Sequence, residues 1–239
     1  MPPSILSYDP QYYDSLPEIE EADALFTERW STDSLAAKVG HVFTKHGVQD
    51  DFGLSLLHRH FDMDPAEILV NIENVAVPWH TASMNPQLAN VMGSSWRIVS
   101  DGLAPIEFHY TNDTIRANIE DHLDFVNELA SVLQELALDK VLGVCAFNGV
   151  DDNDEPSVEF ASGRANITLP MDVAEHEESV MIDTAFAFRD EKGTHTYLSK
   201  VHHFELLTHL SDSSGIITVK ARCKLKCKGT THVKKHLKT

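Results

Sequence analysis

The chain has 239 residues and a formal net charge of −18, with 14 histidines. Eight of its 19 lysine and arginine residues lie in the last twenty positions, where no aspartate or glutamate occurs. Residues 1–219 therefore carry a net charge of −26. This acidic body disfavours nucleic acid as a partner, because it repels phosphate. No apolar run approaches the roughly 20 residues that span a bilayer, and the N-terminus lacks the basic and apolar regions of a secretory signal, so we expect a cytoplasmic protein that does not enter membranes.

Acidic and aromatic residues are frequent in residues 1–30, which also contain four of the ten prolines. We expect a peripheral arm there, with a short helix over 18–30. A second helix is predicted over 32–46, because its apolar residues recur on one stripe. Ser31 or Thr32 suits the cap at its start, and Gly47 suits the left-handed residue that ends it.

The pattern then changes to strands. Apolar residues and histidines alternate with other residues over 52–61, which predicts a strand. We expect a turn at 62–65 and a return strand over 68–77, ended by Pro78. Two further strands, over 95–100 and 106–111, form a predicted hairpin around Asp101-Gly102.

The longest predicted helix covers about 114–139, and a buried strand follows over 141–147. The acidic segment 151–156 reads as a turn, and the rest as an antiparallel meander with strands over 158–161, 180–188, 194–207 and 216–227. We therefore predict an α+β fold, in which a curved, mostly antiparallel sheet packs around the helix at about 114–139, with a shorter helix at about 32–46. The predicted organisation is an arm over 1–30, one domain over 31–228 and a short basic tail over 229–239.

The most informative pattern is His58-Arg59-His60. On a strand, residues i and i+2 point to the same side, so both imidazoles would share one space about 6–7 Å apart at their Cα atoms. Imidazole suits zinc and iron, and a carboxylate often completes the ligand set. The competing interpretation is that both are neutral core histidines, because Leu54 and Leu56 share their predicted face.

The third ligand has several candidates on neighbouring segments, namely Asp62, Asp64, Glu67, Glu73, His80 and His109. The segment Gly53 to Glu67 resembles the first motif of the cupin family, which has a glycine, a His-x-His pair and a downstream glutamate. That resemblance implies a small β-barrel with a divalent metal bound by His58, His60 and Glu67. The chain departs from the motif, since its glycine-to-histidine spacer is one residue short, Glu67 lies too far downstream, and the family's second motif is missing.

Two other clusters contain groups able to bind metal or move protons. Cys223, Cys227, His232 and His236 are zinc-binding residue types, but only four residues separate the second cysteine from the first histidine, where a zinc finger has about twelve. The cysteines also fall on the apolar face of the predicted strand 216–227, which favours a structural role. His203 and Glu205 share a strand face and could form an acid–base pair or a solvated surface.

Residues 52–61, Phe-Gly-Leu-Ser-Leu-Leu-His-Arg-His-Phe, resemble a segment of uncharacterised fungal proteins, and this resemblance implies an intracellular setting but no activity. We find neither the glycine-rich phosphate-binding motifs nor the Gly-x-Ser-x-Gly motif of hydrolases. We therefore expect a protein that binds or transforms a small molecule in a cavity lined by His58 and His60, either with a divalent metal such as zinc or iron or by acid–base chemistry. The alternative is a non-enzymatic interaction protein that uses its acidic body and its basic C-terminal strand and tail.

Overall fold

The structure is a computed structural model, and it describes residues 4–83, 90–110, 117–147, 157–170, 181–188 and 200–202. The helices of these ranges are α1 (Pro10–Asp14), α2 (Ile19–Thr27), α3 (Thr32–His46) and α4 (Leu123–Glu135), with 3-10 turns η1 (Thr81–Ser83) and η3 (Ile119–His122). The strands are β1 (Ser4–Ile5), β2 (Phe52–Leu56), β3 (Glu67–Ile72), β4 (Val75–His80), β5 (Val91–Val99), β6 (Gly102–Tyr110), β7 (Leu142–Ala146), β8 (Ser157–Ser162), β9 (Ala165–Pro170), β10 (Met181–Asp183), β11 (Ala185–Phe186) and β12 (Lys200–His202).

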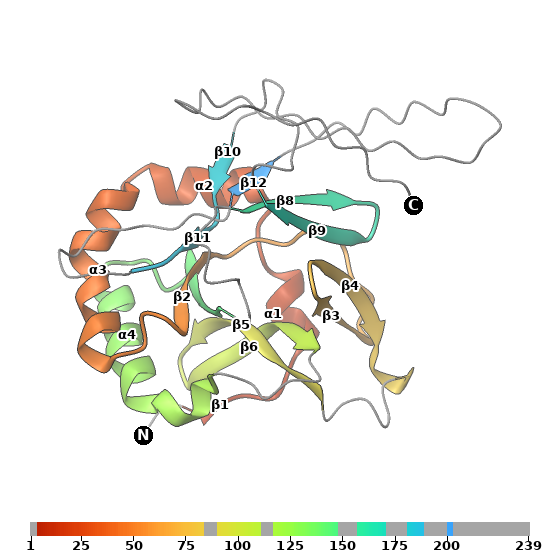
Figure 1. The fold of residues 1–239 in the computed structure, drawn as a ribbon, viewed down its shortest axis with the longest axis horizontal. Coiled ribbons are helices and arrows are strands. Elements are labelled where there is room, and N and C mark those ends of the chain that lie inside the picture. Colours follow the sequence, from red (N-terminus) through yellow and green to blue (C-terminus); the bar gives the residue numbers. More distant parts are fainter. Residues whose placement is uncertain are drawn as a thin grey trace.

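All these strands belong to one twelve-stranded sheet in the order β10-β12-β8-β9-β4-β3-β6-β5-β7-β2-β11, with β1 paired to β6. Most neighbours are antiparallel, and the parallel pairs are β1–β6, β3–β6 and β8–β12. The sheet curls into a half-barrel, with α2, α3 and α4 on one side and the β3–β4 hairpin on the opposite side (Figure 1). The predicted α+β class and the curved, mostly antiparallel sheet are confirmed.

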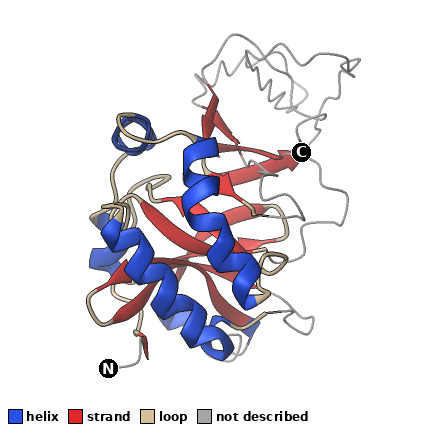
Figure 2. Cartoon of the chain, turned by 90° about the vertical axis from the view of Figure 1, so that its left-hand side faces the viewer, coloured by secondary structure: helices blue, strands red, loops and turns tan. Residues whose placement is uncertain are grey.

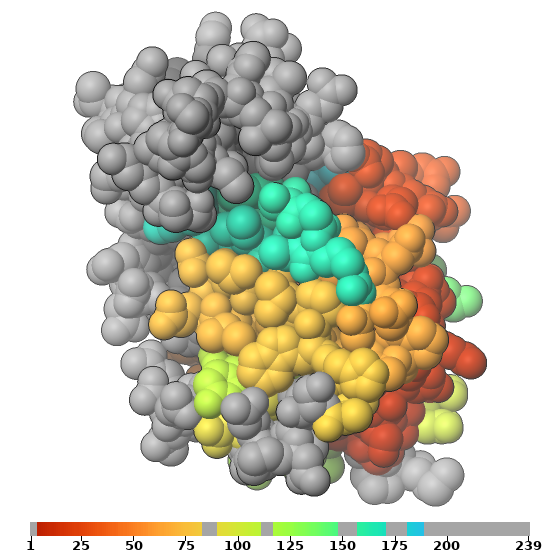
Figure 3. Space-filling view, turned by 90° about the vertical axis from the view of Figure 1, so that its right-hand side faces the viewer, coloured from red at the N-terminus to blue at the C-terminus, as the bar shows by residue number. Residues whose placement is uncertain are grey.

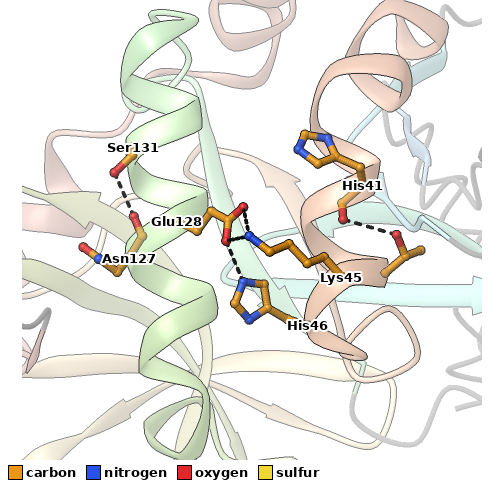
Figure 4. A network of polar contacts seen from close by, with 7 residues as sticks. His41, Lys45, His46, Asn127, Glu128 and Ser131 are labelled. Carbon is orange, nitrogen blue, oxygen red and sulfur yellow. Dashed lines mark hydrogen bonds and ion pairs between the residues drawn. The ribbon is translucent and has the colours of Figure 1, made fainter.

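Helices α3 and α4 lie side by side across one face of the sheet (Figure 2). Their buried residues join those of α2 and of β2, β5 and β7 in the main core, which contains Phe26, Val39, Phe43, Phe52, Phe125, Leu129, Val144 and Phe186. At the surface, Glu128 of α4 binds Lys45 and His46 of α3 (Figure 4). The apolar stripes of the two helices therefore supply one half of the core.

The bounds of α3 agree with the prediction because local signals set both of its ends. Ser31 accepts the backbone N–H of Ser34, and the Ser34 hydroxyl accepts the backbone N–H of Ser31, which forms a capping box. At the other end Gly47 has φ of +66°, the left-handed conformation in which glycine carries no steric penalty.

The helix predicted over about 114–139 is shorter in the described residues. It begins with η3, where the Asn118 side chain accepts the N–H of Glu120, and it continues through α4 to Glu135. The two elements give 17 helical residues, against 15 in α3. The chain leaves the helix before Asp139, since Ala137 has φ of +56°.

The N-terminal arm packs into both faces of the fold. Phe26 of α2 lies in the main core, and β1 pairs with β6. On the other face, Tyr13 and Leu16 belong to a second core cluster with Leu57, Leu69, Ala76 and Ile106. Tyr13 is completely buried, so the arm supplies core residues to the same fold as the sheet.

Several predicted strands differ from those observed. The strand predicted over 52–61 ends at Leu56, so His58 and His60 follow β2 and do not continue it. The strand predicted over 68–77 is a hairpin of β3 and β4, because the chain turns at Glu73, which has φ of +56°. Strand β9, which was not predicted, pairs with both β8 and β4. The β3–β4 and β8–β9 hairpins consequently form one continuous surface (Figure 3).

The predicted turn at 151–156, the strand at 216–227 and the tail at 229–239 lie outside the described residues, as do His203, Glu205 and the Cys223, Cys227, His232 and His236 cluster. Within the part of the chain that is described, no helix combines the length and apolar character needed to cross a membrane.

Candidate functional site

His58 and His60 lie immediately after β2, in a loop that the N-terminal arm holds in place. The Arg59 guanidinium binds Glu18, with its Nε 2.8 Å from the carboxylate. The Tyr13 hydroxyl accepts the backbone N–H of His60 at 3.1 Å. These contacts hold the two residues that follow His58, so the histidines keep a defined position although neither is in a strand.

The two imidazole rings meet, as the His-x-His pattern predicted. Their centroids are 4.7 Å apart, and the ring planes are inclined by 79°. His58 Nδ1 lies 2.8 Å from the carbonyl oxygen of Leu56, and because that oxygen can only accept, Nδ1 carries the proton. The other ring nitrogen, Nε2, therefore carries no proton and can only accept; it is buried and has no hydrogen-bond partner among the described residues.

His60 contacts two side chains from distant parts of the sheet. Its Nε2 lies 3.2 Å from Glu107 of β6 and 3.4 Å from the amide nitrogen of Asn166 of β9. Asn166 also binds Glu159 of β8, which accepts a further hydrogen bond from Thr168. We call His58, His60, Glu107, Glu159 and Asn166 the histidine cluster.

The environment drives the two histidines toward different protonation states. Burial, reinforced by the neighbouring His60, lowers the pKa of His58 from 6.5 to about 4, so this ring is neutral at pH 7. Burial also opposes the charged form of His60, but the hydrogen bond and negative charge of Glu107 outweigh it and raise the pKa of His60. The cluster thus pairs a neutral imidazole with one that retains its proton more readily.

The environment also shifts the pKa values of the two carboxyl groups, Glu107 and Glu159, in opposite directions. Burial would raise the pKa of Glu107, but the hydrogen bond and charge of His60 dominate and lower it. Burial raises the pKa of Glu159, and the charge of Glu107 adds to this effect. Pairs of titratable groups with pKa values driven in opposite directions are typical of acid–base sites.

The cluster lies on the sheet face opposite to α3 and α4. Across this face, strand pairing places Glu107 of β6 beside Ser95 of β5 and Ser95 beside Cys145 of β7. Cys145 in turn lies beside Gly53 of β2. The Glu107 side chain is 27% exposed even though surrounding protein strongly desolvates its carboxylate, so part of this side chain reaches water. Burial raises the pKa of the Cys145 thiol to about 12, which makes it a poor nucleophile.

Glu67, predicted as the third metal ligand, is engaged elsewhere. Its carboxylate forms an ion pair with Arg164 and accepts the backbone N–H of Asp64. Among the described residues, no group of three or more histidine, cysteine, aspartate or glutamate side chains is arranged to hold a metal ion. The predicted set of His58, His60 and Glu67 is therefore not assembled, and the carboxylate bound to His60 is that of Glu107.

Glu107, Glu159, Asn166 and Tyr13 were not predicted as site residues. A signal was present for the two glutamates, since each is a charged residue within an otherwise apolar strand segment, 103–108 in β6 and 158–160 in β8. A carboxylate buried at such a position needs a hydrogen-bonding or charged partner, or has a functional role. The sequence pattern does not indicate that both would face the same pair of histidines.

No protein-family model, curated protein or solved structure matches this chain.

Proposed function

We propose that the protein binds a small molecule at the histidine cluster and can transfer a proton to or from it. His58 would accept a hydrogen bond from the ligand through Nε2. His60, whose pKa is raised by Glu107, would be the proton donor. Glu159 and Asn166 would form the opposite side of the site.

The observation that carries this proposal is the buried, unpartnered Nε2 of His58. A buried acceptor without a partner costs about 1–3 kcal/mol of stability, so native proteins rarely keep one. The ring is held by its Nδ1 hydrogen bond, which leaves Nε2 oriented and available. Strained or unsatisfied polar groups of this kind are more frequent at binding sites than in ordinary cores.

The acid–base form is better supported than the metal form. A metal site needs at least three convergent ligands in most cases, and the described residues contain no such group. We therefore expect protein purified without a histidine tag to contain substoichiometric zinc and iron. Stoichiometric metal that is lost in both His58→Ala and His60→Ala would establish the metal form instead.

The interaction alternative uses the acidic body together with the basic C-terminal strand and the tail at 229–239, and the basic strand and the tail lie outside the described residues. No observation of the described residues favours it over small-molecule binding.

The direct test is a ligand-observed NMR screen of a chemically diverse library of small molecules against the whole chain. Ligands of the cluster should lose binding in His60→Gln and Glu107→Gln. The matched controls are His46→Gln and Glu128→Gln, because this second His–Glu pair has a nitrogen–oxygen distance of 2.8 Å and lies between α3 and α4 on the opposite face of the sheet (Figure 4). Hits that survive the cluster variants, or no hits at all, would refute the proposal.

A further inference from the structure

Two hydrogen-bond acceptors of the histidine cluster are left free, and they bear on its ligand. In the part of the chain that the structure describes, neither His58 Nε2 nor Asn166 Oδ1, both of them buried atoms, has a hydrogen-bond partner. Both side chains are more than nine-tenths buried, with exposed fractions of 8% and 5%. Both side chains contact His60, His58 through its ring and Asn166 through its amide nitrogen.

The orientation of the Asn166 amide follows from its neighbours. Its nitrogen donates to the Glu159 carboxylate, which can only accept when ionised, and this places the amide oxygen on the other side. The hydrogen bonds from Thr168 and Asn166 end on Glu159, and that from His60 Nε2 ends on Glu107, so none of them reaches the two free acceptors. A ligand that satisfies both acceptors must therefore supply two donors.

The charges of the cluster disfavour an ionic ligand. When His60 is protonated it forms an ion pair with Glu107, and a second cation would compete with His60 for this carboxylate. An anionic ligand would meet the negative charge of Glu107 and would bring further acceptors. Hydroxyl groups satisfy both conditions, because they donate hydrogen bonds without a net charge.

We propose, building on the function proposed above, that the ligand of the histidine cluster is an uncharged molecule with two neighbouring hydroxyl groups, as in a polyol or a sugar. One hydroxyl donates to His58 Nε2 and the other to Asn166 Oδ1. Each hydroxyl loses a hydrogen bond to water when it binds and gains one to His58 or Asn166. An analogue that lacks one hydroxyl leaves one of these acceptors without a partner, so each contact favours the diol over that analogue.

Four matched probes separate the ligand classes: 1,2-cyclohexanediol, cyclohexanol, 2-aminocyclohexanol and 2-hydroxycyclohexanecarboxylate. Each is titrated at pH 7 into protein labelled with 15N-histidine, and the His58 Nε2 resonance is followed. The diol should move this resonance toward the position of a hydrogen-bonded nitrogen. Cyclohexanol should bind about 3- to 10-fold more weakly, which is the effect of one missing hydrogen bond, and the two charged probes should bind more weakly still.

A variant isolates the acceptor itself. In His58→Asn the shorter amide can keep a donor near the Leu56 carbonyl oxygen while removing Nε2, so the preference for the diol over cyclohexanol should disappear. His46→Asn, on the helical face, should leave that preference intact. The wild-type resonance shift needs no variant, so it tests the proposal even if His58→Asn fails to fold.

Different failures are distinguishable. If a charged probe binds as tightly as the diol, or if compounds from the diverse library move the Nε2 resonance while the diol does not, the ligand class is wrong and the binding function stands. If Nε2 already resonates as a hydrogen-bonded nitrogen without ligand and no compound moves it, an internal water occupies the acceptor and both proposals fail.

Discussion

From the lowered pKa of His58 we predict how the free energy of unfolding depends on pH. The unfolded chain takes up a proton on this ring below pH 6.5, whereas the folded protein resists protonation until about pH 4. Because the unfolded state then binds more protons, the stability contribution is fully present above pH 6.5 and is lost as the pH falls toward 4. Between pH 7 and pH 5 the loss amounts to about 2 kcal/mol, at 1.36 kcal/mol for each unit of separation.

Removing the titrating ring should remove this loss. The free energy of unfolding is measured by urea denaturation, followed by tryptophan fluorescence, for the wild type and for His58→Asn at pH 5, 6 and 7. We expect the difference between the two proteins to change by about 2 kcal/mol over this range in favour of the variant at low pH, which is a shift of the urea midpoint by about 1 M.

A second variant separates the effect of removing the titrating group from the effect of changed packing. His58→Phe also lacks a titrating group but packs differently, so its absolute stability should differ from that of His58→Asn while its pH dependence should match. A difference from wild type that stays constant from pH 5 to pH 7 in both variants would mean that His58 protonates normally in the folded state, and the burial argument would then be wrong.

Four further predictions concern His60, its partners and the end of α3. Glu107→Gln should lower the pKa of His60, because burial then acts without the opposing carboxylate, and NMR titration of the ring should show it; an unchanged value would exclude the ion pair. In the wild type, the His60–Glu107 pair should add most stability between about pH 4.5 and 6.5. In this range Glu107 is ionised and His60 is protonated in both the folded and the unfolded chain. Tyr13→Phe removes the acceptor for the His60 N–H and should cost about 1–3 kcal/mol in thermal or urea unfolding, whereas a cost near zero would mean that water replaces the hydroxyl. Gly47→Ala should cost about 1–2 kcal/mol because of the left-handed backbone, and a neutral outcome would contradict the observed end of α3.

The parts of the fold that the sequence predicted well depend on local signals. Ser31 and Gly47 define α3 within a few residues of its ends, and Asp101-Gly102 locates the turn between β5 and β6. Where the structure departs from the prediction, the cause is tertiary. The alternation that suggested a strand through His60 is broken after Leu56, because the arm draws the following residues out of the sheet through Tyr13 and Glu18.

The site was only half predictable for a related reason. His58 and His60 are two residues apart, so any extended segment keeps them close, and the prediction that they meet did not depend on the strand being right. Glu107 is brought to them by strand pairing that includes a bulge in β5 around Ser95, which no sequence pattern specifies. The metal hypothesis chose Glu67 because it is near in sequence, whereas the observed partner is near only in space.

The assembly of the cluster also depends on the curl of the sheet. In the sheet order, β9 lies three steps from β6, and a flat sheet would separate Glu107 from Asn166 by about 14 Å, with their side chains standing parallel. Both instead reach one nitrogen of His60, at 3.2 and 3.4 Å. Among the described residues, the ladder between β9 and β4 has two residue pairs, Val75–Ile167 and Ala76–Asn166. The short ladder that joins the β8–β9 hairpin to β4 therefore carries Asn166, and a change that weakens it should disturb the free acceptors before it disturbs the helical core.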